Sequence, residues 1–411
     1  MNRRVVITGY GVISPIGDTE DEIIRHLTQG ISGVKELEDD GFLSGFIQSG
    51  VYGRIDYPKT YPFERNHRKT MGPVAFVACE SARRAIEQSG LDKEFLTSGR
   101  VGVAFGSIHG SPFVQREIMK TYFQGGKDGD PGINAADFLK SMAHTTAVNI
   151  TKMFGISGRV ISPCTACTTS SQSIGFGYEA IRFGMQDAMV CGGADEYDTS
   201  TVAVFDNLRA CSIRFNDTPH LTPRPFDSRR DGLVVGEGAG ALVLESLEHA
   251  KHRGATILGE VVGFATNNNG GDMILPNLAG ITQTLSLALA DAGITGEEVD
   301  FISAHATATR QGDTIEAKAI HDVYGDKPRV TALKSYMGHT IAACGAIETI
   351  ITLMMMKHGF IPATLNLDTV DESCAMINHT RQLLDEKINT ASVQNFAFGG
   401  VNTALVLKKF N

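Results

Sequence analysis

Two kinds of hydrophobic pattern alternate along the chain. Short runs rich in β-branched residues predict strands, and longer runs with apolar residues at three- and four-residue steps predict helices. The predicted strands cover residues 5–7, 101–105, 159–162, 188–191, 239–244, 299–303, 329–332 and 404–407. The predicted helices cover residues 71–88, 170–182, 281–292, 314–324 and 342–357. This alternation is typical of an α/β protein whose sheets are covered by helices.

The residues around these runs argue against a signal peptide and a membrane helix. The first predicted strand follows Arg3 and Arg4 and is interrupted by glycine, unlike the hydrophobic region of a signal peptide. The longest apolar run soon meets Lys357 and His358, so no segment approaches the ~20 residues that a membrane helix requires. Several glycines and one proline predict a surface loop over residues 123–134. We therefore expect a soluble, cytoplasmic protein.

The length of the chain suits two domains or one long duplicated domain. Its 411 residues are 42% hydrophobic, which is enough to bury a large core. A strand followed by a turn occurs twice, at residues 160–164 just before Cys167 and at residues 301–305, which end at His305. We therefore predict two similar halves, residues 1–255 and 256–411, that meet at a shared site.

Net charge and cysteine count narrow the class of protein. The formal net charge of -9 makes broad nucleic-acid binding unlikely, because phosphates need a positive surface. An acidic protein partner would have to meet a local basic patch. The seven cysteines are odd in number and scattered, so they do not form the disulfide framework of a small secreted domain. We expect free thiols.

The most reactive candidate is Cys167, which stands in the segment Cys164-Thr165-Ala166-Cys167-Thr168-Thr169-Ser170-Ser171. Small polar residues follow it and open an apolar helical run, so its sulfur is expected at a helix N-terminus. Backbone N–H groups and the helix dipole lower a thiol pKa there from about 8.5. Taken alone, a cysteine is more often a small buried hydrophobe, and that interpretation stays open for this residue.

Cys164 and Cys167 also form a Cys-x-x-Cys pair, a spacing found in redox and zinc sites. A zinc site needs two further ligands, and the chain has no second Cys-x-x-Cys and no His-x-x-x-His. A redox pair usually has an aromatic, glycine and proline setting that is missing here, although the spacing alone leaves that alternative open. We expect no metal at this position.

Two histidines and a lysine stand at the ends of predicted elements. His305 ends a predicted strand and is followed by Asp313 and Glu316 at the start of a predicted helix. His339 precedes an Ala- and Gly-rich helix, and Lys334 lies five residues before it. A thiol opposite two imidazoles and an ammonium suits carbon–carbon bond formation on thioesters.

Six landmarks occur in order along the chain: Thr165-Ala166-Cys167, Arg224-Pro225-Phe226-Asp227 with Arg230-Asp231-Gly232, Gly236-Glu237-Gly238-Ala239-Gly240, His305-Ala306-Thr307-Ala308-Thr309 with Asp313 and Glu316, Lys334 with Gly338-His339, and Phe398-Gly399-Gly400-Val401-Asn402. With these landmarks the chain resembles a β-ketoacyl-acyl carrier protein synthase over essentially its whole length. Stretches at residues 110–112, 271–273 and 357–361 make it more similar to the synthase I type than to synthase II. The resemblance implies a thiolase-like five-layer α-β-α-β-α sandwich built from two similar halves. It also implies a homodimer, or a heterodimer with a related subunit.

The resemblance implies a decarboxylative Claisen condensation in fatty acid or related polyene and polyketide lipid synthesis. Cys167 would hold the acyl group, with an oxyanion hole formed by the backbone N–H groups of Cys167 and Phe398. Malonyl-acyl carrier protein would then supply the attacking carbanion. His305 and His339 would stabilise the enolate that forms as CO2 leaves. No cofactor is implied, since the substrates arrive on the phosphopantetheine arm of acyl carrier protein.

The resemblance also implies supporting roles for the residues around these groups. Lys334 would pair with Glu316 and orient the loops that carry the histidines, and Asp313 would support them. The positions that bind substrate are Thr307 and Thr309, which hold the pantetheine arm, and Gly399.

Acyl carrier protein is acidic, so a basic patch is expected near the mouth of the site. The candidates are Arg65, Arg68 and Lys69, just before the helix predicted from residue 71. The solvated start of a helix explains the same three residues equally well.

Four positions depart from the family pattern. Ala306 replaces the glycine of a His-Gly-Thr motif, Cys344 stands where alanine is typical, Ala397 replaces a glycine in the gating loop, and Val401 replaces a threonine. Alanine disfavours positive φ and would restrict a loop that must swing Phe398. We expect the chemistry to remain and the pathway to be a specialised one, such as polyene or other secondary lipid synthesis.

Three alternatives stay open. A thiolase shares the fold and nucleophile but needs a second catalytic cysteine in a Cys-x-Gly setting, where this chain has Phe398-Gly399-Gly400. A chain-length factor, which is a non-elongating partner subunit, usually lacks the nucleophile that Cys167 provides. A binding protein on the same scaffold gives no reason for Cys167, His305, Lys334 and His339 to occur together.

Overall fold

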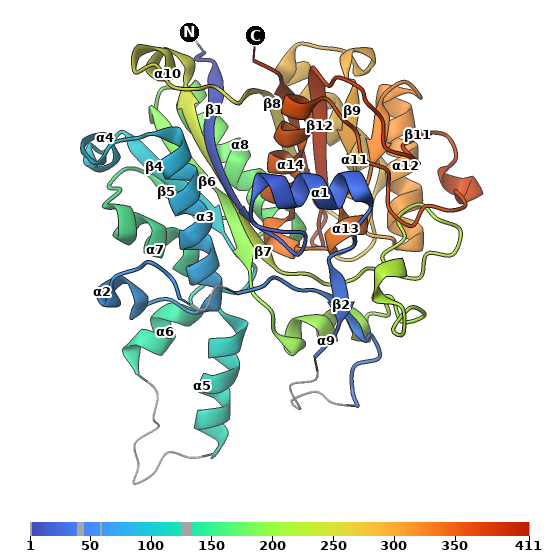
Figure 1. Ribbon diagram of the computed structural model, residues 1–411, viewed down its shortest axis with the longest axis horizontal. Coiled ribbons are helices and arrows are strands. Elements are labelled where there is room, and N and C mark those ends of the chain that lie inside the picture. The colour runs from blue at the N-terminus through green and yellow to red at the C-terminus, as the bar shows by residue number, and fades with distance from the viewer. Residues whose placement is uncertain (1, 39–44, 58–59, 125–133, 411) are drawn as a thin grey trace.

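The computed structural model of the chain describes residues 2–38, 45–57, 60–124 and 134–410 (Figure 1). Its strands form one long sheet in the order β11-β10-β9-β12-β13-β8-β1-β7-β6-β4-β5. β1 (Val5–Ile13) and β8 (Gly259–Asn268) pair only along residues 5–7, so two parts of the sheet share a short seam. The loop expected at residues 123–134 lies mostly outside the described residues.

The two parts of the sheet repeat the same topology. In the N-terminal part β4 is parallel to β5 and β6, while β7 is antiparallel to both β6 and β1. In the C-terminal part β9 is parallel to β10 and β12, while β13 is antiparallel to both β12 and β8. These strands are β4 (Val101–Gly106), β5 (Val160–Ile161), β6 (Ala188–Asp195), β7 (Gly238–Ser246), β9 (Phe301–Ser303), β10 (Arg329–Thr331), β12 (Thr390–Phe396) and β13 (Val401–Lys408), with β11 (Asn378–His379) at one edge.

Helices form three layers around the two parts of the sheet (Figure 1). The outer layer on the N-terminal part holds α3 (Pro73–Ser89) and α7 (Thr145–Phe154), and the outer layer on the C-terminal part holds α11 (Leu278–Ala292) and α12 (Arg310–Tyr324). The central layer holds α8 (Thr169–Arg182) and α14 (Cys344–His358), which contact strands of both parts. The predicted five-layer thiolase-like architecture is confirmed.

The central helices are apolar on all sides, as a helix buried between two sheets must be. Every residue of α14 from Cys344 to Met356 is buried. The segment Ile341–His358 has the length and hydropathy of a membrane span, but 89% of it is buried inside the molecule, which identifies it as a core helix. Gly345 lets α14 approach α8 closely, because a Cβ there would lie 2.0 Å from Ser171 Oγ. The two central helices are therefore in tight contact.

All the predicted strands and helices are present, with ends shifted by a few residues. The patterns miss β8, β12, α1 (Glu20–Gln29), α5 (Pro112–Gln124), α7, α9 (Thr199–Asn207) and several shorter elements. β12 was missed because it carries Thr, Ser, Gln and Asn and so lacks an apolar run, although most of it is buried. The remaining elements include β2 (Val34–Glu36), β3 (Val51–Gly53), α2 (Arg65–Arg68), α4 (Lys93–Thr97), α6 (Ala135–Ser141), α10 (Leu247–His252) and α13 (Lys334–Met337). The boundary predicted near residue 255 falls between α10 and β8 and stays a prediction.

Candidate active site

The structure brings the predicted reactive groups together between the two halves. Cys167 follows β5, His305 follows β9 and His339 follows β10. The Cys167 sulfur and one ring nitrogen from each histidine all lie within 4.8 Å of one another, and all three residues are buried. The two imidazole rings have centroids 5.2 Å apart and stand nearly perpendicular, at 88°.

Strained backbone positions support these loops. Cys167 lies in the short 3₁₀ turn η2 (Ala166–Thr168) that leads into α8, and η5 (Ile341–Ala343) leads into α14 in the equivalent place. Each turn begins with a residue of positive φ, 49° at Ala166 and 47° at Ile341, and Ala308 in the His305 loop has a φ of 67°. Side chains other than glycine rarely adopt this conformation, and such strain concentrates at functional sites.

The surroundings of Cys167 correct one expectation about its acidity. The sulfur lies 2.9 Å from His339 Nε2, and the backbone N–H groups of Cys167 and Phe398 point toward it. Burial raises the pKa of the Cys167 thiol to about 12, although the Lys334 ammonium and those N–H groups act in the opposite direction. The position at a helix N-terminus was predicted correctly, but the lowered pKa was not, because burial outweighs the dipole. The resting site therefore contains a neutral thiol.

Alkylation of Cys167 is expected to accelerate steadily with pH. With a thiol pKa near 12, the thiolate fraction rises about tenfold per pH unit from pH 7 to 10 without a plateau. The measurement is the rate of iodoacetamide labelling followed by intact-protein mass. A Cys164→Ser background removes the exposed thiol that would otherwise react. A plateau below pH 9 would contradict the raised pKa.

Both histidines are neutral at physiological pH. Burial, followed by the nearby Lys334 ammonium, holds the pKa of His305 and of His339 well below 6.5. Nδ1 of each ring has no hydrogen-bond partner among the described residues. No described protein group therefore fixes the tautomer, and Nε2 of His339 is free either to accept or to donate a proton.

Lys334 has a different partner from the one predicted. Its ammonium lies 2.5 Å from Glu348 Oε1 on α14, and both side chains are fully buried. Glu316 instead accepts the backbone N–H groups of His305 and Ala306, each at 2.7 Å. The prediction that Lys334 pairs with Glu316 is wrong, because the Glu316 carboxylate is occupied with shaping the His305 loop. Glu348 was missed, and its only signal is an acidic residue inside an otherwise apolar helix.

Two buried aspartates position the loops around the site. Asp313 accepts from the backbone N–H groups of Phe226 at 2.8 Å and Ala308 at 3.1 Å, which supports the His305 loop as predicted. Asp195 at the end of β6 accepts from Ala342 N at 2.7 Å and Ile108 N at 3.2 Å. Asp195 thereby joins the turn before α14 to the loop after β4. Sequence analysis missed it, because these contacts cross both halves of the chain.

A cavity of about 490 Å³ leads to the reactive groups. Cys167, His305 and His339 lie along its wall. The cavity is also lined by Thr307, Thr309, Phe398, Arg209, Arg214 and Arg310. The hydroxyls of Thr307 and Thr309 lie 3.2 Å apart, and their role in holding the pantetheine arm stays a prediction. The three arginines place positive charge within the same cavity.

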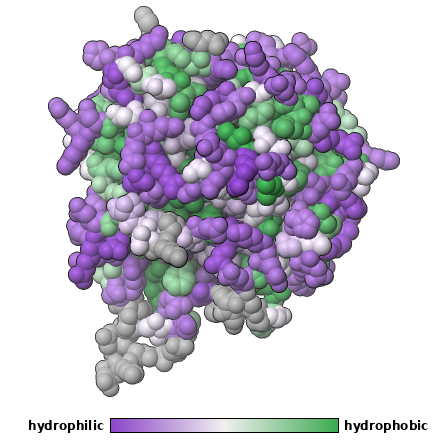
Figure 2. All heavy atoms as spheres, in the orientation of Figure 1, coloured by the Kyte–Doolittle hydropathy of each residue, from purple (hydrophilic) through white to green (hydrophobic). Residues whose placement is uncertain are grey.

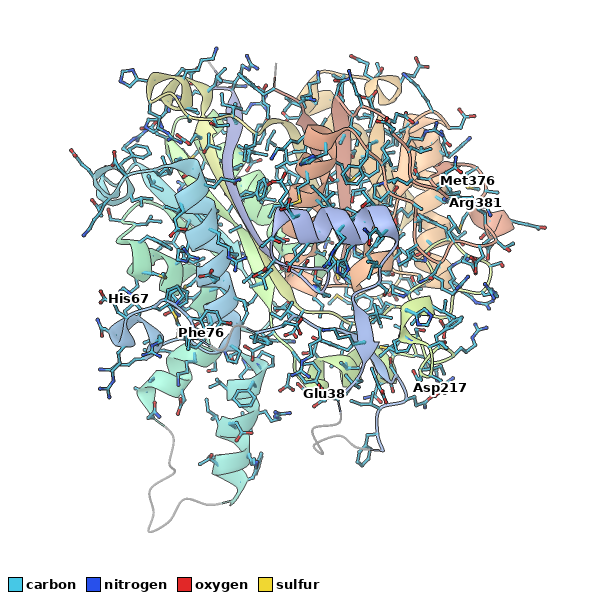
Figure 3. All side chains as sticks on the ribbon, in the orientation of Figure 1. Glu38, His67, Phe76, Asp217, Met376 and Arg381 are labelled. Atoms are coloured by element: carbon cyan, nitrogen blue, oxygen red, sulfur yellow. The ribbon has the colours of Figure 1, made fainter. Side chains whose placement is uncertain are left out.

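The basic patch predicted for carrier-protein binding does not line this cavity. Arg65, Arg68 and Lys69 are exposed, on α2 and just after it, and do not line the cavity. α2 contacts α7 of the N-terminal half. In Figure 3, His67 of α2 lies at one edge of the molecule and Met376 and Arg381 lie at the opposite edge.

The gating loop accommodates alanine without strain. Positive φ occurs at Gly399 (86°) and Gly400 (72°) but not at Ala397, whose N–H donates to Val401 O at 2.8 Å. In this conformation the alanine therefore does not meet the restriction that was expected. Gly399 N donates to Met273 O at 2.7 Å, and the Phe398 ring stacks on Phe205 with centroids 5.7 Å apart.

The same three reactive residues are close enough to bind a metal ion. Cys167, His305 and His339 offer one thiol and two imidazole ligands. The Lys334 ammonium acts electrostatically on all three, which disfavours a second cation in the same buried space. The arrangement therefore suits a nucleophile beside two neutral hydrogen-bonding rings better than a metal centre.

Comparison with known proteins gives matches over almost the whole chain. The N-terminal domain of beta-ketoacyl synthases matches residues 2–250, and the C-terminal domain matches residues 258–368. The chain is 34% identical to 3-oxoacyl-[acyl-carrier-protein] synthase 1 of Escherichia coli K12, over 99% of each chain. A beta-ketoacyl synthase structure from Burkholderia phymatum STM815 is 38% identical, with a TM-score of 0.95 and full coverage of both chains. A type II polyketide synthase structure, an acyl-carrier protein in complex with its hexaketide-bound ketosynthase, is 29% identical with a TM-score of 0.90 and full coverage of both chains.

Proposed function

This chain belongs to the β-ketoacyl synthase family, and from that premise we propose that it joins an acyl group held on Cys167 to malonyl-acyl carrier protein, releasing CO2. The observation that carries this proposal is the contact of 2.9 Å between Cys167 Sγ and His339 Nε2, with His305 beside it in one buried cavity. A thiol nucleophile needs a proton acceptor within hydrogen-bond reach. The ring of His339 provides that acceptor, and the ring of His305 provides a second polar group beside it.

In the first half-reaction the Cys167 sulfur attacks the thioester carbonyl of an acyl-acyl carrier protein. His339 Nε2 accepts the thiol proton as the new carbon–sulfur bond forms. The negative charge on the carbonyl oxygen is met by the N–H groups of Cys167 and Phe398, which already point toward the sulfur. The old carbon–sulfur bond then breaks, and the pantetheine thiolate leaves with the proton from His339.

In the second half-reaction His305 and His339 donate hydrogen bonds to the thioester oxygen of the malonyl group. The bond between the malonyl α-carbon and the carboxylate carbon breaks, and CO2 leaves. The electron pair of that bond stays on the α-carbon and is shared with the thioester oxygen as an enolate. The carbanion then attacks the acyl carbonyl, and the Cys167 sulfur leaves as a thiolate, which takes up one proton from solvent to restore the resting thiol. No described protein group fixes the tautomer of His339, so after acylation its single proton can move from Nδ1 to Nε2. Each neutral ring then has one N–H to donate and acts by electrostatic stabilisation.

We propose that the substrate belongs to a specialised lipid pathway, such as polyene synthesis. The support is the set of departures from the family pattern, of which Cys344 touches the nucleophile directly: its thiol donates to Cys167 O at 3.2 Å. The test is incubation with a panel of acyl-carrier proteins, then intact-protein mass, then malonyl-carrier protein. A mass gain that malonyl-carrier protein removes supports condensation, and its size gives the accepted acyl group. Absence of any adduct across the panel would rule out the proposed reaction.

The thiolase alternative finds no support in this geometry. A thiolase needs a second cysteine facing the substrate, and the Cys344 thiol is buried and directed at the Cys167 carbonyl rather than into the cavity.

We further propose that the reaction runs in the cytoplasm without a cofactor or metal. Full activity after dialysis against a chelator is the expected result, and its loss would contradict this proposal.

Carrier-protein docking is proposed at the mouth of the cavity. Arg209, Arg214 and Arg310 line the cavity and suit the phosphate of the pantetheine arm and an acidic carrier. Arg310→Glu is expected to raise the KM for carrier-bound substrates about tenfold, more at low salt. The rate of Cys167 alkylation serves as the control and should not change. If Arg68→Glu raises the KM instead, the carrier docks on α2, as predicted from sequence.

We propose that the chain forms a homodimer through β5. This strand ends the sheet, so one side of its backbone pairs with no described strand, and Val160 is exposed on it. Other exposed apolar residues on α5, α6 and α7 include Phe113, Met119, Phe138, Leu139 and Val148. Hydrophilic residues cover most of the face shown in Figure 2, with smaller hydrophobic areas between them. Light scattering should give twice the monomer mass, and a monomer active only with a related subunit would indicate a heterodimer.

A further inference from the structure

A path of buried hydrogen bonds runs behind the reacting groups. Lys334 is paired with Glu348, as described above, and the second oxygen of that carboxylate accepts from Asn395 Nδ2 at 2.8 Å. The other end of the Asn395 amide accepts a hydrogen bond from Ser171 Oγ. The same Nδ2 also lies 3.5 Å from Cys344 Sγ, a position already noted as a departure from the family pattern. All of these side chains are at most 1% exposed.

This path connects three segments that the chemistry uses. Ser171 lies one helical turn after Cys167 on α8, and Glu348 lies on α14, which follows His339. Asn395 lies on β12, directly before the loop that carries Phe398. One amide therefore joins the helix of the nucleophile, the helix behind His339 and the strand that leads into the gate.

The charges in this path reach the reacting groups. The Lys334 ammonium opposes the effect of burial on the pKa of Cys167 and acts with burial to lower the pKa values of His305 and His339. Glu348 is the carboxylate that pairs with Lys334, so the position of Glu348 determines where the ammonium lies. A buried carboxylate keeps its charge only with hydrogen-bond donors, and both Asn395 and Lys334 donate to Glu348.

From this juxtaposition we propose that Asn395 is a positioning residue: its amide fixes the Glu348 carboxylate and thereby aims the Lys334 ammonium at the Cys167 and His339 pair. Asn395 lines no part of the cavity and touches no reacting atom, so its effect passes through Glu348. The inference rests on the proposed function, because it assigns a role within that reaction.

Two variants at Asn395 test the proposal in different ways. Asn395→Leu has nearly the same size but cannot donate to Glu348, so kcat should fall about tenfold while the KM for carrier-bound substrates stays within about twofold. Asn395→Asp adds a second carboxyl group beside Glu348. Its ionisation places negative charge near Cys167, so alkylation at pH 9 should slow at least about threefold, with the difference closing at lower pH.

A matched control lies next to Asn395 on the same strand. Gln394 is equally buried but faces the opposite side of β12, where its amide Nε2 contacts Ser392. Gln394→Leu should leave both the alkylation profile and the ratio of kcat to KM as in the wild type. A merely structural role for Asn395 would move thermal stability in both Asn395 variants without moving the alkylation profile.

The outcomes separate this inference from the proposed function. Acyl transfer to the wild-type protein is measured in the same series, and its absence would overturn the proposed reaction. If wild-type transfer is normal, an unchanged kcat in Asn395→Leu or a wild-type alkylation profile in Asn395→Asp overturns only the role of Asn395. If one variant fails to fold, the other decides by the same criterion.

Discussion

Replacing Cys167 with alanine is expected to lower the condensation rate by at least about three orders of magnitude and to abolish the acyl adduct. Among the described residues the acyl group has no other thiol to bind near the two imidazoles, because the thiol of Cys344 beside Cys167 is directed at the Cys167 carbonyl and does not line the cavity. The measurement is intact-protein mass after incubation with acyl-acyl carrier protein, followed by product formation with malonyl-carrier protein.

Cys164→Ala provides the matched control for this substitution. Cys164 lies three residues before Cys167 and is exposed, and its thiol donates to Ile108 O. The adduct should persist in this variant at the wild-type level. If the adduct survived in Cys167→Ala and disappeared in Cys164→Ala, the nucleophile would be Cys164, and the assignment to Cys167 would be wrong.

Replacing His305 with alanine is expected to separate the two half-reactions. Acylation of Cys167 should continue, since the proton acceptor in contact with the sulfur is His339 and not His305. Condensation should fall by about two to four orders of magnitude, because the enolate oxygen loses one of its two proposed donors. Single-turnover mass measurements follow the formation of the adduct and its consumption by malonyl-carrier protein in the same sample.

His339→Ala gives the complementary result. Both half-reactions should slow, since Nε2 of this ring contacts the sulfur and also belongs to the proposed enolate site. If His305→Ala slowed acylation as much as His339→Ala did, the two rings would act together on the thiol, and the division of roles would be wrong.

The reacting groups could be found from sequence because Cys167 and His305 stand a few residues after short apolar strands and His339 follows β10 and the short helix α13. Cys167 follows β5 and His339 follows β10, which hold equivalent places in the two parts of the sheet, and His305 follows β9, the strand that pairs with β10. Local patterns therefore identified the α/β class, the candidate nucleophile and the two imidazoles, whereas the five-layer fold was implied by the resemblance to the family.

The partners of these groups could not be found in the same way. The pairing of Lys334 with Glu348 depends on which face of α14 turns toward the site. Since apolar residues occur on all sides of α14, its hydrophobic pattern does not show which face that is. The raised pKa of Cys167 depends on how completely the fold buries the sulfur, which no local pattern encodes. Asn395 was missed because β12 is buried but polar, a combination that hydrophobic periodicity does not detect.

The absence of a side chain at Gly345 has a consequence for catalytic precision. The nucleophile and the imidazole that touches it are carried at the starts of α8 and α14, and these helices abut at Gly345 and Ser171. One residue along a helix is a rise of about 1.5 Å, which is enough to break a contact between sulfur and nitrogen. The axial position of α8 relative to α14 thus sets the distance between the Cys167 sulfur and the His339 nitrogen.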